Sequence, residues 1–328
     1  MINTRWDLIL VGAGLANGLI AWRLRQCQPA LNVLLIEAGP TPGGNHTWSF
    51  HHGDISAAQH AWLDPLVAHR WADYDVFFPE RTRTVAGGYT SVTSERFAEV
   101  ISRALGDHLV TQTPISRLTP TSVALEDGRI LEAGAVIDGR GYQPSPHLTV
   151  GLQAFLGQQW QLKHPHGLTR PRLMDATVDQ QGGYRFVYTL PLSATSLLIE
   201  DTHYIDRATL DHDRARLNIA YYAKAQDWAL GTLQREGAGQ PADHPDGQPR
   251  GILAGGPGSA TKRPTRRPVS PHDRLFASAG SVACRYDRRA ILFYAGIAVS
   301  PYSRLRGAVL AAAALFSHAQ PHAVSGRP

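Results

Sequence analysis

The sequence predicts an α/β protein in which a Rossmann-type nucleotide-binding domain precedes a domain built on an antiparallel β-sheet. Residues 6–39 follow the pattern strand, glycine turn, helix, strand. From residue 152 onward, short strand-like runs are separated by turns, which is typical of antiparallel sheets. The length of 328 residues and the hydrophobic content of 43% suffice for one large domain or for two.

The first segment predicts a site for the ADP part of FAD or NAD. An apolar run ends at a glycine turn, a helical pattern follows, and a second apolar run ends at an acid. Glycines let the backbone approach a pyrophosphate, the helix N-terminus supplies N–H donors, and the acid binds ribose hydroxyls. The residues expected to contact the cofactor are Gly12, Ala13, Gly14, Leu15, Ala16 and Glu37.

One position departs from the usual glycine pattern. Asn17 stands where a third glycine is expected, and Gly18 follows it. Two explanations remain open. Either the helix packs slightly farther from the strand, or Ala16 and Gly18 supply the small surface that close packing needs.

The segments up to residue 150 together resemble the discontinuous FAD-binding domain of flavoproteins. Residues 40–52 are expected to form a loop, and Ser94 is expected to cap a helix. Short strands flank the turn at residues 127–128, as in a hairpin. A later buried strand ends at Asp138 and Gly139, a position that flavoproteins use near the cofactor.

The following region, residues 151–236, predicts a substrate-binding sheet and a helix. Two strand runs, GYRFVYTLPL and TSLLIEDTHY, are joined by a turn near Ser193. Residues 208–233 have the pattern of one amphipathic helix.

Charge and composition change near residue 236. Residues 1–236 hold 20 Lys+Arg and 23 Asp+Glu, whereas residues 237–328 hold 12 and 4, together with ten of the 22 prolines. This tail is expected to be disordered or poorly packed. Its basic run at residues 262–267 is not expected to bind nucleic acid.

The cysteine count and the hydropathy pattern argue against disulfide-rich, membrane-spanning and secreted proteins. Cys27 and Cys284 are too few and too far apart to indicate a disulfide framework or a metal site. No apolar run approaches the ~20 residues of a membrane-spanning helix, and no secretory signal precedes the first strand. The cytoplasm is therefore the expected compartment.

Several motifs together resemble the bacterial lycopene β-cyclases, flavoproteins of carotenoid biosynthesis. The resemblance runs from about residue 5 to 236. Its motifs are DLILVGAGLANGLIAWRL, GGNHTWSFHH, TSERFAEVI, AVIDGRGY, GLQAFLGQ, MDATVDQ, YRFVYTLPL and LLIEDTHY.

This resemblance implies a two-domain FAD protein with a substrate sheet over the flavin. The implied reaction is redox-neutral: a proton adds to the terminal double bond of lycopene, the carbocation cyclises, and a ring proton leaves. It also implies reduced FAD, NAD(P)H as electron donor, and access to a membrane-dissolved carotene at the inner face of the cytoplasmic membrane.

The motif LLIEDTHY supplies the catalytic candidates. Strand alternation puts Leu198, Glu200 and Thr202 on one face and Asp201 on the other. In the resembling family the acidic pair is catalytic, which maps to Glu200 as acid/base and Asp201 as support. An apolar pocket would raise the pKa of such a carboxyl group. An edge-strand salt bridge is the alternative explanation.

The loop after the second strand, the helix after it and several aromatic residues supply further candidates. Asn45 and His46 are expected to contact flavin or substrate, and Arg96 to reach a cofactor phosphate, although loop packing and a solvated arginine are the alternatives. Aromatic faces can stabilise a developing cation. The aromatic candidates for that role are Trp48, Trp160, Phe186 and Tyr188.

The tail is consistent with a one-nucleotide frame offset near codon 236–237. Back-translated and shifted by one nucleotide, residues 267–280 can encode GLFHPTTGYSLPL, similar to the late flavin segment of the resembling family. The same offset turns residues 237–248 into EQGSLPITLTG and residues 318–328 into MLNRMLFLAG. Three matches at one offset favour a frame error, so the chain is expected to lack part of its flavin pocket.

Two other functions remain open. A flavin monooxygenase or dehydrogenase acting on another apolar substrate would share the fold but consume reductant. A protein that only binds flavin or a membrane surface would leave pigments unchanged.

Overall fold

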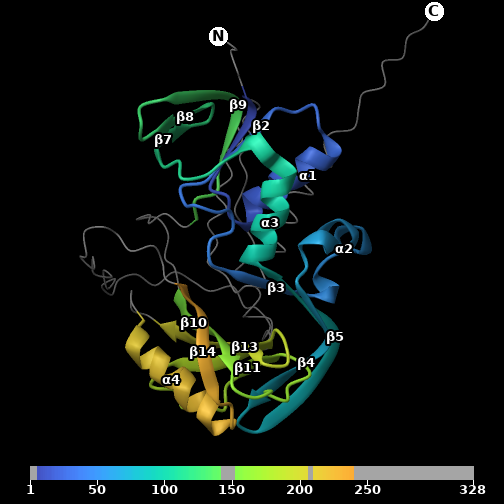
Figure 1. Ribbon diagram of the computed structural model, residues 1–328, viewed down its shortest axis with the longest axis vertical. Helices are drawn as coiled ribbons and strands as arrows, with labels where there is room; N and C mark the ends of the chain where they lie inside the picture. Colours follow the sequence, from blue (N-terminus) through green and yellow to red (C-terminus); the bar gives the residue numbers. More distant parts are fainter. Residues whose placement is uncertain (1–5, 142–151, 206–209, 240–328) are drawn as a thin grey trace, which may run out of the picture.

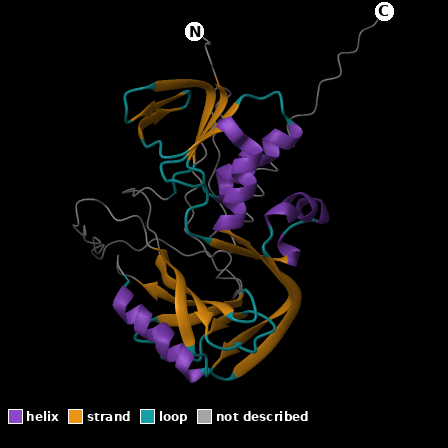
Figure 2. Ribbon diagram, viewed as in Figure 1, coloured by secondary structure: helices purple, strands orange, loops and turns teal. Residues whose placement is uncertain are grey.

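The computed structural model describes residues 6–141, 152–205 and 210–239. Two β-sheets lie one above the other in Figure 1, with helices α1 and α3 beside the upper sheet and α4 on the lower one. Figure 2 shows the same division by secondary structure. Of the tail at residues 237–328 that is expected to be disordered, residues 240–328 lie outside the described residues.

The upper sheet has six strands in the order β6-β2-β1-β9-β8-β7. Strand β1 pairs in parallel with both β2 and β9. The carboxyl ends of these three strands therefore meet at one edge of the sheet, where parallel α/β folds bind ligands. The strands are β1 Trp6–Val11, β2 Val33–Ile36, β6 Leu109–Val110, β7 Ile115–Thr119, β8 Ser122–Leu125 and β9 Ile130–Asp138.

Two helices, α1 (Leu15–Cys27) and α3 (Ser94–Leu105), share one apolar core with this sheet. A Cβ atom on Gly18 would lie 2.3 Å from the Phe97 ring. Gly18 thus supplies its small surface to α3 and not, as one of the two explanations had it, to the strand. Asn17 has a different role, because its Nδ2 donates to the Val11 carbonyl at 2.9 Å.

The lower sheet has eight strands in the order β14-β10-β13-β12-β11-β4-β5-β3. All pairs are antiparallel except β11 with β4. The strands are β3 Thr47–His51, β4 His69–Phe78, β5 Arg81–Thr93, β10 Leu152–Leu162, β11 Arg172–Asp175, β12 Tyr184–Pro191, β13 Ser196–Ile205 and β14 Leu230–Gly239.

The division of the chain at residue 150 does not separate the two sheets. Strands β3, β4 and β5 precede that residue and belong to the lower sheet. Helix α3 follows β5 directly and leads the chain back to β6 of the upper sheet. Residues 237–239, assigned to the tail from the sequence, extend β14 along β10.

Three local expectations are wrong. Residues 47–51 of the expected loop form β3, because they pair with β5. Thr93, not Ser94, caps α3, since its hydroxyl accepts from the Arg96 amide. The expected helix over 208–233 is α4 (His212–Ala225) only; Asp227 has a positive φ and the chain then enters β14.

Helix α4 covers one face of the lower sheet, where buried side chains of β10, β12 and β13 meet it. A short helix, α2 (Ala57–Leu63), and three 3-10 turns, His52–Asp54, Asp64–Leu66 and Gly106–His108, complete the described elements. None of the helices in the described part is long and apolar enough to cross a membrane.

Candidate functional site

The glycine turn has the geometry of a pyrophosphate site. Gly12 has a φ of +84°, and a Cβ there would lie 2.7 Å from the Gly139 carbonyl oxygen. Gly14 caps α1 without any side chain, and a Cβ on it would meet nothing within 4 Å. The first turn of α1, which begins with Leu15 and Ala16, therefore faces open space, where its N–H groups can bind an anion.

Two acids flank this turn. Glu37 follows β2, and its carboxylate accepts from the Ala13 amide at 2.7 Å and the Gly39 amide at 2.8 Å. Asp138 ends β9 and accepts two hydrogen bonds from the Arg140 guanidinium. Burial raises the pKa of Asp138, but the hydrogen bonds and charge of Arg140 outweigh it, so the pKa is lowered. The expected residues are thus brought together, with Gly139 touching Gly12.

The loop after β2 links the glycine turn to the lower sheet. Its Gly43 amide donates to the Ala13 carbonyl at 2.9 Å. At its other end, Asn45 Nδ2 donates to the Glu236 carbonyl of β14 at 2.9 Å. His46 is exposed and lies against Trp48, with ring centroids 5.6 Å apart. Asn45 therefore lies between the predicted cofactor turn and the sheet that carries Glu200.

Arg96 is engaged elsewhere. Its Nε donates to the Pro65 carbonyl at 2.7 Å, and Nη1 pairs with Glu99 at 2.7 Å. These contacts favour a structural role over the predicted phosphate contact.

Glu200 lies on the face of β13 opposite α4. Its neighbours on that face, Leu198 and Thr202, are buried, as strand alternation predicted. In the register of the sheet, Glu200 lies between Gly157 of β10 and Tyr188 of β12. Gly157 in turn pairs with Gly237 of β14. Because Asn45 contacts β14 next to Gly237, the loop after β2, here called the cofactor loop for its predicted role, lies about two strand spacings from Glu200, roughly 10 Å.

The environment of Glu200 favours its protonated form. Burial raises the pKa of the carboxyl group from 4.5 to about 7, a hydrogen bond from Thr202 opposes this, and the charge of Asp201 adds to it. The Thr202 hydroxyl is 3.1 Å from Glu200 Oε1. A carboxyl group with this pKa can both donate and accept a proton near neutral pH.

Hydroxyl groups from three strands meet beside Glu200. Tyr188 and Tyr89 hydroxyls are 2.9 Å apart, Tyr188 donates to Ser49 at 3.2 Å, and Ser49 pairs with Ser91 at 2.6 Å. Burial raises the pKa of Tyr188 well above its usual value. This chain of hydroxyls joins β3, β5 and β12 and holds the Tyr188 ring next to Glu200. Tyr89 is not predictable from sequence spacing, since it lies 111 positions before Glu200.

Only part of the predicted aromatic set faces this carboxyl group. Phe186 and Tyr188 share its face by alternation along β12. Trp160 instead packs with the core under α4, and Trp48 packs on Phe97 of α3 at 5.1 Å.

Asp201 belongs to a separate buried network. Its carboxylate accepts from Arg185 Nε at 2.6 Å, Asn218 Nδ2 at 2.7 Å and His203 Nε2 at 2.9 Å. Asp201 is fully buried, and Asn218 comes from α4. The structure therefore does not bring the acidic pair together as a catalytic dyad. The contacts of Asp201 join the sheet to α4.

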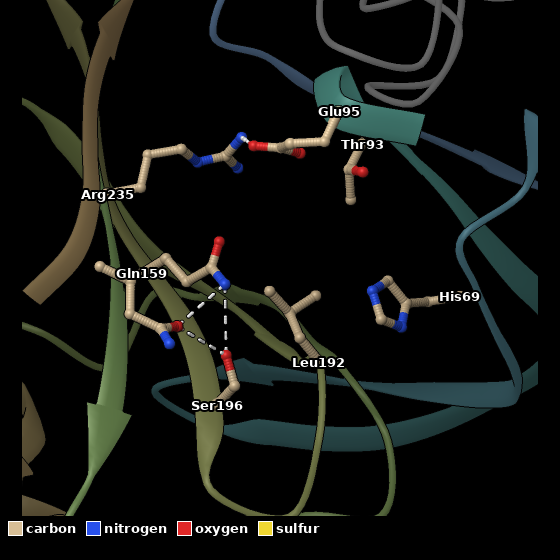
Figure 3. Close-up of a pocket in the computed structure, with 8 residues that line it drawn as sticks. His69, Thr93, Glu95, Gln159, Leu192, Ser196 and Arg235 are labelled. Atoms are coloured by element: carbon tan, nitrogen blue, oxygen red, sulfur yellow. Dashed lines mark hydrogen bonds and ion pairs between the residues drawn. The ribbon is translucent and has the colours of Figure 1, made fainter. Parts of the chain in front are cut away.

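A polar pocket of about 550 Å³ lies farther along the face that carries Glu200 (Figure 3). Ser196 on β13 precedes Glu200 by four residues and accepts from Gln159, while Arg235 and Glu95 form an ion pair of 2.9 Å across the pocket. The residues that line it are His69, Thr93, Glu95, Gln159, Leu192, Ser196, Gln234 and Arg235.

Comparison with known proteins decides the family. A family model described as "Lycopene cyclase protein" matches residues 7–242. This chain belongs to the lycopene cyclase family. The lycopene beta-cyclase of Pantoea ananas is 60% identical over 238 residues, and that of Pseudescherichia vulneris is 59% identical over 233.

The family match is partial in length. The alignment with the Pantoea ananas protein covers 73% of this chain and 62% of that protein. The alignment with the Pseudescherichia vulneris protein covers 71% of this chain and 60% of that protein. The chain thus spans about three fifths of the length of the curated relatives it matches.

Solved structures support the predicted fold class. A p-nitrophenol 4-monooxygenase of Pseudomonas putida matches with a TM-score of 0.51 and 13% identity, covering 71% of this chain and 68% of that one. A geranylgeranyl bacteriochlorophyll reductase-like protein of Thermoplasma acidophilum gives 0.52 and 12%, covering 72% and 66%. At these identities the likeness concerns the fold alone, a mixed α/β architecture.

Proposed function

We propose that this chain carries the acid/base centre of a lycopene β-cyclase, an intramolecular isomerase of carotenoid biosynthesis. The observation that carries the proposal is Glu200. It is a carboxyl group with a pKa near 7, on a largely apolar sheet face, about two strand spacings from the cofactor loop. Family membership favours cyclisation over a monooxygenase reaction on another apolar substrate.

In the proposed reaction, Glu200 both donates the proton that starts the cyclisation and removes the proton that ends it. Protonated Glu200 donates its proton to the terminal double bond of an acyclic carotene end. The resulting carbocation is attacked by the neighbouring double bond, which closes a six-membered ring. The Glu200 carboxylate then takes a ring proton, which leaves a β-ring and restores the acid. Repetition at the other end converts lycopene to β-carotene through γ-carotene.

Tyr188 is positioned to assist. Its ring lies beside Glu200, and its hydroxyl is held by Ser49 and Tyr89. An aromatic face next to a carbocation stabilises the charge without accepting a proton. Asp201 supports Glu200 indirectly, because it fixes the strand that both residues share.

The glycine turn is proposed to hold FAD. The pyrophosphate would bind at Gly12, Gly14 and the first turn of α1. The Glu37 carboxylate would accept hydrogen bonds from the ribose hydroxyls in place of the one it accepts from the Ala13 amide. Asn45 and His46 would lie near the flavin ring, and Gly139 would support Gly12. When bound there, FAD reduced by NAD(P)H would supply electron density near the substrate, and these residues would hold it in place.

The proposed substrate dissolves only in membranes. We therefore place the protein in the cytoplasm, peripherally at the inner face of the cytoplasmic membrane.

The proposal is tested in cells that accumulate lycopene. They express the 328-residue chain or a copy in which one nucleotide is removed at codon 236–237. β-Carotene or γ-carotene from either copy, separated by chromatography, supports the proposal. Glu200→Gln in the active copy should abolish both products. Unchanged lycopene with both copies, when both proteins accumulate and bind FAD, overturns it.

A further inference from the structure

Along β12 and β13, aromatic side chains continue the face of Glu200 toward Tyr184 and Tyr204. Phe186 registers with Thr202, one row beyond Glu200, and Tyr184 registers with Tyr204, two rows beyond. The ring centroids are 6.1 Å apart for Tyr184 and Phe186, 5.7 Å for Tyr184 and Tyr204, and 6.4 Å for Phe186 and Tyr204. These three residues are here called the aromatic strip.

The strip leads from the interior to the surface. Phe186 is buried, with 6% of its surface exposed, whereas Tyr184 is 40% and Tyr204 is 45% exposed. Four residues separate Glu200 from Tyr204 along β13, which is about 13 Å at the rise of a strand. The polyene of a carotene is longer than this, so its far end would extend beyond the strip.

In the opposite direction, Leu198 and Leu190 pack with Tyr89 in a buried cluster, and the face then becomes polar. There the same sheet face runs from Leu198 to Ser196 and into the polar pocket of Figure 3, where Gln159 and the Arg235–Glu95 ion pair lie. An apolar chain placed in that pocket would bury these polar groups away from water at a cost in free energy.

We infer that the aromatic strip is the path of the carotene chain: one end lies at Glu200, and the polyene passes over Phe186 and leaves the protein between Tyr184 and Tyr204. This inference rests on the proposed function and adds the direction of the substrate. Flat aromatic rings can pack on a conjugated chain without requiring hydrogen bonds from it. The exposed end of β12 and β13 would then be the side from which the membrane-dissolved substrate enters.

A matched pair of tyrosines tests the inference. Tyr204 on the strip and Tyr221 on the outer face of α4 are both exposed, at 45% and 66%. The 328-residue chain and its variants Tyr204→Asp and Tyr221→Asp are titrated with lycopene in detergent micelles, and binding is followed by induced circular dichroism of the polyene. Thermal melting verifies that each variant is folded.

Tyr204→Asp should weaken lycopene binding roughly tenfold, because a charge replaces an apolar contact, while Tyr221→Asp should leave it unchanged. Phe186→Leu provides a milder second variant with the same expected direction. Glu200→Gln should keep lycopene binding, which separates the path from the chemistry.

Other outcomes overturn the inference in distinguishable ways. If lycopene binds but both Tyr204→Asp and Phe186→Leu bind as well as the parent chain, the path is wrong and the cyclase proposal stands. Weakening by Tyr221→Asp alone would move the contact to α4. Absence of lycopene binding by both the folded 328-residue chain and the folded copy with one nucleotide removed contradicts the path and the proposed function together.

Discussion

The carboxyl group of Glu200 lies in an environment that favours its uncharged form. Burial raises its pKa from 4.5 to about 7, so between these two values the folded chain retains a proton that the unfolded chain loses. The contribution of protonated Glu200 to the free energy of unfolding is therefore fully present below pH 4.5 and is lost as the pH rises from 4.5 through 7. The loss is about 1.4 kcal/mol per pH unit within that window.

Glu200→Gln should remove this dependence. Its free energy of unfolding should exceed that of the parent chain by about 3 kcal/mol at pH 8 and equal it at pH 4. Urea denaturation followed by tryptophan fluorescence at both pH values measures the difference. The exposed Glu132→Gln serves as the control and should show no such dependence. Equal effects of Glu200→Gln at the two pH values would contradict the raised pKa.

A substitution at Gly14 can distinguish an effect on cofactor binding from an effect on folding. A methyl group there meets no protein atom within 4 Å, but it would occupy the space beside the first turn of α1. Gly14→Ala should leave the free energy of unfolding within about 0.5 kcal/mol and weaken FAD binding roughly tenfold. Flavin fluorescence titration of the purified chain measures the affinity. Gly53→Ala also has room for its methyl group and should change neither quantity; undiminished FAD binding by Gly14→Ala would exclude the proposed pyrophosphate position.

At the scale of elements, one buried network joins β12, β13 and α4. Arg185, Asp201 and Asn218 are nearly or fully buried, and the carboxylate accepts from three donors. Removing one partner of a buried ion pair leaves the other charge uncompensated, which costs more than the loss of a surface pair. The network therefore fixes α4 on the face opposite Glu200.

Asp201→Asn should lower the free energy of unfolding by about 3 kcal/mol, because Arg185 keeps its charge in a buried position. Chemical denaturation measures the change. Asp213 also pairs with an arginine, Arg216, but on the exposed side of α4. Asp213→Asn should have little effect. A comparable loss in both variants would mean that the buried network is no more stabilising than a surface pair.

The elements that follow local rules were predictable, and those set by distant partners were not. The glycine turn, Glu37 and the end of β9 depend on residues close in sequence or on parallel pairing, and the structure brings them together. The prediction that the helix extends to residue 233 was wrong, because residues 230–239 form a strand that pairs with β10. Likewise β3 exists because β5 pairs with it. Alternation placed Glu200 and Asp201 on opposite faces correctly, but Tyr89 reaches the site through tertiary contacts alone.

At the scale of the molecule, the two edge strands of the lower sheet approach each other. Arg235 of β14 donates to Thr47 of β3 at 2.8 Å and pairs with Glu95 of α3 at 2.9 Å. The eight-stranded sheet is thus strongly curved, with Glu200, Tyr89 and Tyr188 grouped on its inner face. Strand β14 also leads directly to residue 240, near where the family match ends at residue 242.

The composition change at this point gives the last prediction. With one nucleotide removed at codon 236–237, the chain would continue as EQGSLPITLTG. The substitution Gly237→Glu would then place a second carboxylate in the row of Gly157 and Glu200. The same frame supplies GLFHPTTGYSLPL, which resembles a flavin-contacting segment. We expect the restored copy to form β-carotene in lycopene-accumulating cells and the 328-residue chain to form none.

This expectation rests on the frame offset inferred from the sequence: residues translated out of frame would have no consistent face to bury and would not complete a flavin pocket. Chromatography of the pigments and the DNA sequence through codon 236 examine the prediction independently. Equal β-carotene from both copies would show that residues 240–328 are dispensable and that β14 already closes the site. Cyclisation by the restored copy alone would locate the lesion beyond Glu236, because both copies share the glycine turn, Glu200 and the aromatic strip.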